Sequence, residues 1–391
     1  MLISIAIILL SGLLLGKACK AIRFPSLFGM IIAGIIIGPH VLNLIDSSIL
    51  EISSDIRRIA LIIILIRAGL KLDLSDLKKN GHSAVLMCFL PACFEIVGMV
   101  ILAPVILGMS RLDAAILGAV IGAVSPAVIV PRMIKLIDEG YGTNKGIPQM
   151  ILAGASVDDV FVIVMFTTFT GLAQGENVDI MAFVNIPLSI ITGVVIGLIV
   201  GYILYLVMNK FQMNSIIRTI AVLCISFVLS AVETDLNVFP FASLIAIMCL
   251  GVAIRRADKD MAVEISGQYN KLWVVAEVFL FVLVGASVAI DQALTEGVNA
   301  IILILLILLF RMAGVFVCMI GARLSIREKI FCMIAYTPKA TVQAAIGGLP
   351  LAMGLACGQT VLTVSVIAIL LTAPLGAFGI DLTYKKFLQH T

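Results

Sequence analysis

The sequence predicts an all-α polytopic membrane protein with 13 transmembrane helices, arranged as two inverted six-helix repeats joined by a linker helix. Three observations predict this fold class. First, 62% of the 391 residues are hydrophobic and 13% are charged, whereas soluble domains are about half apolar and about a quarter charged. Second, apolar runs long enough to cross a bilayer follow one another along the whole chain. Third, segments of the first half recur in the second half in the same order.

The expected helices are apolar runs that end at charges, Gly-Pro pairs or polar clusters. The first run has neither a basic segment before it nor a small-residue cleavage site, so we expect a first span and not a removable signal. The 13 runs cover residues 2–17, 24–45, 57–71, 83–108, 112–137, 148–172, 186–208, 215–232, 238–254, 272–290, 298–322, 330–349 and 360–380.

The basic residues predict the orientation in the membrane. Twenty Lys and Arg residues fall on the side that the chain reaches after odd-numbered helices, and only Arg57, Arg58 and Arg111 fall on the other. Because cytoplasmic loops carry the excess of basic residues, we expect a cell-membrane protein with an external N-terminus and a cytoplasmic C-terminus. Three of the 26 basic residues remain, and they lie within the predicted spans: Arg67, Arg311 and Lys339.

Composition also limits the partners. The net charge is only +3 and the basic residues form no block, so we expect no nucleic-acid partner. The eight Cys residues show no paired spacing typical of zinc, and the three His residues fall at predicted loops or ends. We therefore expect no cofactor and the lipid bilayer as the main surrounding.

Four matched segments define an internal repeat, at offsets of 212 to 218 residues. They pair helices 1–6 (residues 1–185) with helices 8–13 (residues 211–391) and leave helix 7 (residues 186–210) as a linker. Corresponding helices are seven apart, an odd number, so they cross the membrane in opposite directions. Inverted repeats are typical of secondary transporters, with the substrate site at the midplane where the repeats meet.

Helices 5 and 12 are predicted to be interrupted. Each carries a proline near its middle, Pro126 or Pro338, which follows a hydroxyl residue, Ser125 or Thr337. Proline removes one backbone donor and frees a carbonyl in the preceding turn. Within a membrane such a break is tolerated only beside protein, water or an ion. A plain proline kink is the simpler explanation for either helix alone, but the matched positions in both halves favour crossed broken helices.

Two adjacent carboxylates, Asp158 and Asp159, lie well inside the predicted helix 6. A carboxylate at bilayer depth costs about 2.5 to 3.5 kcal/mol, so two neighbours need a function or a counter-charge. Ionised carboxylate oxygens bind Na⁺ or Li⁺, and protonation competes with that binding. We therefore expect the aspartates to bind the ion, with Ser125 and Ser156 as hydroxyl neighbours.

The repeat places Glu95 in helix 4 opposite Arg311 in helix 11, which predicts a structural ion pair. Lys339 follows Pro338 in the broken helix 12. Its ammonium is either the counter-charge of Asp158 or a cap on the exposed carbonyl end of a half-helix.

Three segments, VSPAVIVPRM, ASVDDVFVI and YTPKATVQAAIG, together resemble the cation/proton antiporter superfamily, specifically its double-aspartate branch and the NHA-type sodium/proton antiporters. The resemblance implies a homodimer with a mobile core domain, built from helices 4–6 and 11–13, and a dimerisation domain built from the rest. It also implies elevator-like alternating access, with Asp159 as the principal cation and proton carrier. Asp158 is implied to contact Lys339, and Arg311 stands where many bacterial relatives have a lysine.

Three other functions are alternatives to a Na⁺/H⁺ or Li⁺/H⁺ antiporter. A K⁺/H⁺ exchanger is the main alternative, because selectivity depends on cavity geometry. A cation channel tolerates buried carboxylates but does not explain inverted broken helices. An intramembrane aspartyl protease needs two carboxylates from facing helices, and adjacent aspartates on one helix do not meet that requirement, so we expect no enzyme.

Overall fold

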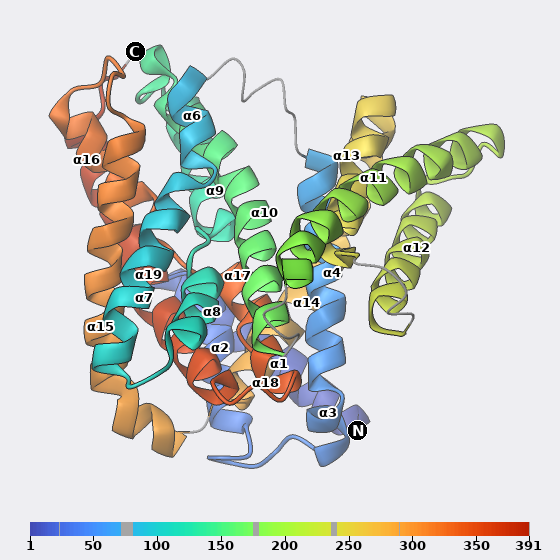
Figure 1. Cartoon of the computed structure of the whole chain (residues 1–391), viewed down its shortest axis with the longest axis horizontal. Helices are drawn as coiled ribbons and strands as arrows, with labels where there is room; N and C mark the ends of the chain where they lie inside the picture. The colour runs from blue at the N-terminus through green and yellow to red at the C-terminus, as the bar shows by residue number, and fades with distance from the viewer. Residues whose placement is uncertain (23, 72–80, 175–179, 236–240, 289, 391) are drawn as a thin grey trace. The chain divides into compact units, whose positions relative to one another are not determined.

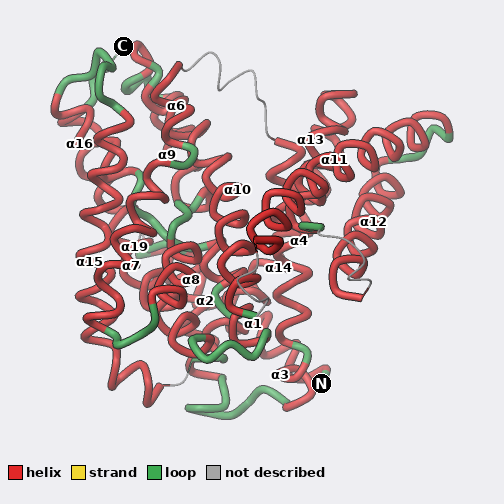
Figure 2. The backbone as a smooth tube through the Cα atoms, in the orientation of Figure 1, coloured by secondary structure: helices red, strands yellow, loops and turns green. Residues whose placement is uncertain are grey.

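The computed structural model describes the chain outside residues 23, 72–80, 175–179, 236–240, 289 and 391 (Figure 1). Within that part all named elements are helices, and the only strand-like feature is a single bridge between Tyr141 and His390 (Figure 2). The helices are α1 Leu2–Ala21, α2 Ser26–Ile37, α3 Ser47–Glu51, α4 Ser53–Lys71, α6 Gly81–Met87, α7 Leu90–Ile106, α8 Arg111–Ile121, α9 Pro126–Asp138, η1 Thr143–Lys145, α10 Ile147–Ala173, α11 Ile180–Lys210, α12 Ser215–Asp235, α13 Ser243–Ala257, α14 Lys259–Ala286, α15 Ile290–Cys318, α16 Ile326–Ala335, α17 Thr341–Ile346, α18 Leu349–Ala352 and α19 Gly358–Phe387.

The all-helical membrane character predicted from the sequence is confirmed. Across the described residues, nine helical segments are long and apolar enough to cross a bilayer, and two shorter apolar helical stretches, Ser26–Ile37 and Thr341–Ala352, accompany them. The total of 13 spans stays a prediction. One expected helix, residues 24–45, is wrong in length, because α2 ends at Ile37 where Gly38 takes an extended conformation before Pro39. Proline disfavours helical backbone in the residue before it.

The described chain divides into two compact units. Unit 1 comprises Met1–Ser54, Leu74–Phe166 and Val278–Thr391, and unit 2 comprises Asp55–Asp73 and Thr167–Glu277. Each unit takes segments from both halves of the sequence. This division by packing therefore differs from the predicted division by repeat, and the repeat boundaries stay a prediction.

In unit 2, three glycines at four-residue spacing bring α11 against α13. A Cβ added at Gly193, Gly197 or Gly201 would lie 2.7, 2.3 or 2.6 Å from a backbone oxygen of α13 or of the residue just before it. Small residues at this spacing let helix backbones approach closely, which is how helices pack in the absence of a hydrophobic driving force between them. The outer face of α11 exposes residues such as Ile191, Val195 and Ile199, as a lipid-facing helix does.

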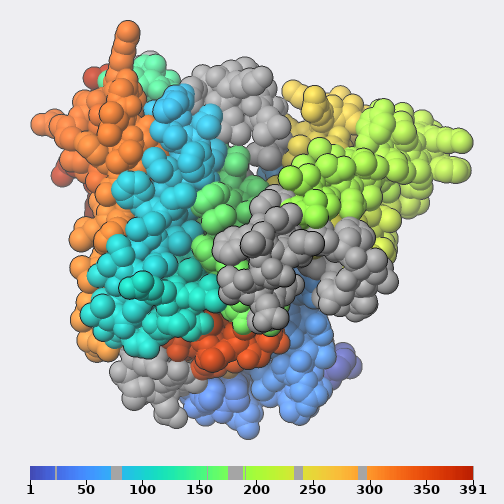
Figure 3. Space-filling view, in the orientation of Figure 1, coloured from blue at the N-terminus to red at the C-terminus, as the bar shows by residue number. Residues whose placement is uncertain are grey.

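In unit 1, two glycines bring α7 and α15 together. A Cβ added at Gly98 would lie 2.6 Å from the ring of Phe310, and one added at Gly314 would lie 2.9 Å from Cα of Pro91. Figure 3 shows α7 (cyan) and α15 (orange) forming adjoining parts of the surface. Glu95 lies three residues before Gly98, and Arg311 lies three residues before Gly314. On a helix, residues three apart share a face, so the close approach sets Glu95 against Arg311.

Candidate functional site

Two interruptions in the helices of unit 1 form the centre of the site. The predicted helix 5 is split into α8, which ends at Ile121, and α9, which begins at Pro126. Ser125 before that proline is extended, as the residue before a proline prefers to be. The predicted helix 12 is likewise split between α16 and α17, across Pro338. The Ser125 backbone N–H donates to the Pro338 carbonyl at 2.8 Å, so the two interruptions touch.

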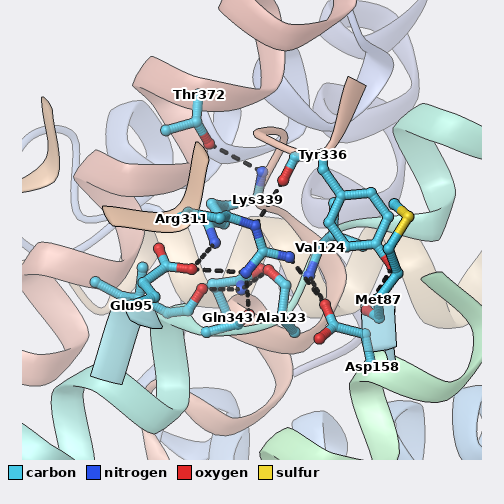
Figure 4. A network of polar contacts seen from close by, with 12 residues as sticks. Met87, Glu95, Ala123, Val124, Asp158, Arg311, Tyr336, Lys339, Gln343 and Thr372 are labelled. Atoms are coloured by element: carbon cyan, nitrogen blue, oxygen red, sulfur yellow. Dashed lines mark hydrogen bonds and ion pairs between the residues drawn. The ribbon is translucent and has the colours of Figure 1, made fainter. Parts of the chain in front are cut away.

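The carbonyls that these interruptions free are bound by two side chains (Figure 4). Gln343 of α17 donates from Nε2 to the Ile121 carbonyl at 3.1 Å and to the Ala123 carbonyl at 2.9 Å. Arg311 of α15 donates to the Gly122 carbonyl, and its Nε donates to the Tyr336 carbonyl at 2.6 Å. The guanidinium therefore holds the carbonyl ends of both α8 and α16, where the helix dipoles place partial negative charge.

The same guanidinium joins a buried cluster of four charges. Arg311 lies 2.6 Å from Oε2 of Glu95 and 2.9 Å from Oδ2 of Asp158, and Lys339 Nζ lies 2.6 Å from Oε2 of Glu95. All four side chains are at most 1% exposed. Two cations and two anions balance, which is the condition under which charges remain stable away from water. We call Glu95, Asp158, Arg311 and Lys339 the charge quartet.

Lys339 corrects one expectation. The resemblance implied a contact between Lys339 and Asp158, but the structure places the Lys339 ammonium on Glu95. Arginine has five donors in a planar fork, so Arg311 reaches Asp158 and Glu95 together. The Lys339 backbone N–H donates to Thr372 Oγ1 at 2.9 Å, which fixes the residue beside the Pro338 break.

The two aspartates of α10 have different surroundings. Asp158 accepts hydrogen bonds from Arg311 and from the Val124 backbone N–H at 2.8 Å. Asp159 is only 8% exposed, its Oδ1 has no hydrogen-bond partner, and no ion pair among the described residues includes it. Successive helix residues point about 100° apart, which places the two carboxylates on different sides of α10.

The hydroxyl residues expected at the site lie in different surroundings. Ser125 is fully buried, and its Oγ finds no partner within the described chain. Thr337 Oγ1 donates to the Ile334 carbonyl at 2.8 Å and so satisfies a carbonyl in the last turn of α16. Ser156 lies in α10, and its side chain is outside the described part of the structure. Pro126 and Pro338 lie at the two interruptions.

Sequence reasoning missed Gln343 and Tyr336. Gln343 is a neutral amide in an apolar stretch, 1% exposed, and carries no charge that would attract notice. A polar side chain in an apolar stretch, four residues after the charged Lys339, was the available signal. Tyr336 contributes its carbonyl to Arg311, its ring lies 5.2 Å from the guanidinium carbon, and its hydroxyl donates to the Met87 carbonyl at 3.0 Å.

With this geometry established, comparison with known proteins decides the family. Residues 5–386 match the family described as sodium/hydrogen exchanger, transmembrane. The chain belongs to the sodium/hydrogen exchanger family. The resemblance stated from the sequence is thereby confirmed, and the members of this family are transporters, which excludes the protease reading.

Individual relatives of this sodium/hydrogen exchanger agree. Sodium/hydrogen exchanger 9B2 of Mus musculus is 33% identical over 96% of this chain and 72% of its own length. Sodium/hydrogen exchanger 9B2 of Homo sapiens is 33% identical over 97% of this chain and 73% of its own length, and 9B1 of Homo sapiens is 31% identical over 98% and 78%. Among solved structures, the sodium proton antiporter MjNhaP1 from Methanocaldococcus jannaschii has a TM-score of 0.85 at 21% identity, covering 98% of this chain and 97% of that chain. That likeness concerns the fold.

Proposed function

We propose that this chain exchanges Na⁺ or Li⁺ for protons across a cell membrane, with Asp159 as the group that carries either ion. The observation that supports this role is the charge balance. The charge quartet sums to zero, and Asp159 is a buried carboxylate with no cationic partner among the described residues. An unpaired buried carboxylate is costly, and either a proton or a bound cation removes that cost. Binding one excludes the other, which couples the two fluxes.

The other side chains have supporting roles in this proposal. Asp158 is held by Arg311 and the Val124 N–H, and its unpartnered Oδ1 remains available to the cation beside Asp159. The buried Ser125 Oγ supplies a neutral oxygen, and Ser156 is the second hydroxyl proposed from the sequence. Hard cations such as Na⁺ and Li⁺ prefer oxygen ligands of these kinds. In this proposal, the charge quartet keeps a net charge of zero whether Asp159 binds a proton or a cation.

The proposal includes an architecture and an assembly. Thirteen spans in two inverted six-helix repeats give an external N-terminus and a cytoplasmic C-terminus in the plasma membrane. Alternating access follows an elevator-like movement of a core built from helices 4–6 and 11–13, within a homodimer formed through the remaining helices. The names of the similar exchangers and of MjNhaP1 support Na⁺ as the transported cation. Exchange of K⁺ for protons is the alternative, since the ligand types do not discriminate by size.

Asp159→Asn tests the proposal. In proteoliposomes with an imposed pH gradient, addition of Na⁺ or Li⁺ to the wild type should dissipate the gradient, and the variant should lose this response, because an amide neither binds a transported proton nor balances a cation. Asp260→Asn, which changes an exposed carboxylate in the first turn of α14, is the matched control and should transport normally. Near-wild-type exchange by Asp159→Asn would remove Asp159 from the mechanism. Adding K⁺ in a separate arm decides between the two cations.

A further inference from the structure

We propose that Gln343 is a positioning residue that fixes the geometry of the ion site by bracing the break between α8 and α9. This inference rests on the proposed ion site at Asp158 and Asp159. Gln343 is a neutral amide, 1% exposed, on α17, the helix that follows the Pro338 break. Its Nε2 carries two hydrogens, and the structure uses both, on the Ile121 carbonyl at 3.1 Å and on the Ala123 carbonyl at 2.9 Å.

The brace completes the capping of three consecutive carbonyls. Gly122, between the two carbonyls that Gln343 binds, gives its own carbonyl to Arg311. Every carbonyl from 121 to 123 thus has a side-chain donor from another element, although Pro126 prevents α8 from continuing. A buried carbonyl without a partner costs about 1 to 3 kcal/mol, so the amide stabilises a non-helical segment that would otherwise be unfavourable.

The braced segment leads directly into the ion site. Val124, the next residue, donates its N–H to Asp158, and Ser125 after it donates its N–H to the Pro338 carbonyl. Gln343 holds the carbonyl of Ala123, which belongs to the same peptide unit as the Val124 N–H. Gln343 binds the carbonyl of this peptide unit and so fixes the orientation of its plane. The N–H on the opposite side of the same plane orients Asp158. Because a peptide unit is planar, the two hydrogen bonds are mechanically linked.

The consequence is a link between the two interruptions that involves no charge. Arg311 also bridges them, but it belongs to the charge quartet and its loss would unbalance that cluster. Gln343 can be altered without changing any charge at the site. Residues that orient the ligands of a metal site, without touching the metal, typically change its affinity by about 10- to 100-fold when they are replaced. We expect Gln343 to set cation affinity in this way.

Gln343→Met tests the inference, because methionine keeps the length and flexibility of glutamine and removes both donors. Na⁺ titration in proteoliposomes should give an apparent KM for Na⁺ that is raised by about tenfold, with Vmax within about twofold of the wild type. Gln343→Leu, which is also neutral and lacks both amide donors, should likewise raise KM and serves if the methionine variant folds poorly. Ser365→Ala is the matched control, since it removes a buried hydroxyl that donates within α19 to the Val361 carbonyl at 2.6 Å.

The outcomes separate this inference from the proposed function. A raised KM in both Gln343 variants, with an unchanged KM in Ser365→Ala, supports the brace. A wild-type KM with only a lower melting temperature would overturn it and leave Gln343 a structural residue. Asp159→Asn is assayed in parallel. If Asp159→Asn is inactive while both Gln343 variants keep a wild-type KM, only the brace fails, and if Asp159→Asn still exchanges ions, the proposed site itself fails.

Discussion

At the scale of single residues, the charge quartet consists of three ion pairs in a chain, from Lys339 through Glu95 and Arg311 to Asp158. The sequence predicted an ion pair between Glu95 and Arg311, and the structure adds Lys339 on the same Glu95 oxygen and Asp158 on the far side of Arg311. Removing one member strands a buried charge, which costs about 3 to 5 kcal/mol. The second substitution that best restores stability is therefore the one that leaves a balanced ion pair intact.

Glu95→Gln and Lys339→Gln should each lower the melting temperature in detergent, and the double variant should recover much of the loss. The double variant leaves the Arg311 and Asp158 pair, which is balanced and 2.9 Å apart. Thermal unfolding of the four proteins of this cycle measures the coupling. The contrasting double variant is Glu95→Gln with Arg311→Gln, because it removes the ion-pair partner of Asp158 and the ion-pair partner of Lys339. Equal recovery in both double variants would contradict the pairing described here.

The sequence could identify the site residues but not all of their contacts. Asp158, Asp159, Glu95, Arg311 and Lys339 were recognisable because charges are rare inside apolar spans. The pairing of Lys339 was wrong, because several carboxylates lie within reach of one flexible ammonium and the sequence does not rank them. Gln343 was missed because an uncharged amide does not stand out in the sequence as a charge does. Its role follows only from the backbone carbonyls that it binds in the folded chain.

At the scale of helices, small residues determine which elements pack closely. Gly197→Ala should lower the free energy of unfolding by about 1 to 3 kcal/mol, because the new Cβ would lie 2.3 Å from the Ala246 carbonyl oxygen and backbone must move to accept it. Gly267→Ala in α14 is the control, since no atom lies within 4 Å of the new Cβ. Alanine there improves helix propensity by about 1 kcal/mol. Denaturation in detergent compares them, and equal melting temperatures would show that α11 and α13 are not held by this contact.

Helix boundaries show where sequence reasoning is accurate. The breaks at Pro126 and Pro338 were predicted from proline chemistry, and both appear as ends of separate helices. The segment after Ile37 was predicted as helix because it is apolar, yet Gly38 and Pro39 end α2 there. α14 extends the other way, beginning at Lys259 where the apolar run was expected at 272, because charged residues such as Lys259 and Asp260 continue a helix beyond the apolar span.

At the scale of the whole molecule, the hydrophobic composition and the order of the apolar runs were sufficient to predict an all-helical membrane protein. They were not sufficient to determine the number of crossings. Nine segments of the described chain qualify as spans by length and composition, and shorter or more polar helices such as α4, α13 and α16 do not qualify on those grounds alone. The orientation of the ends therefore tests the count.

Cysteine labelling can test both the count and the orientation. Arg111 precedes the predicted helix 5 and Arg256 follows helix 9, so five crossings separate them and they should lie on opposite sides. Four crossings separate Arg256 from Lys386, which should share a side.

We expect Arg111→Cys to react with a membrane-impermeant maleimide in intact cells, and Arg256→Cys and Lys386→Cys to react only after permeabilisation, because the basic excess is cytoplasmic. The side chains of Arg111, Arg256 and Lys386 are exposed. Cys19, Cys93 and Cys224, the native cysteines with exposed or partly exposed side chains, are first replaced by serine. A fully reversed pattern would contradict the orientation but keep the parity, whereas Arg111 and Arg256 on one side would contradict the number of crossings between them.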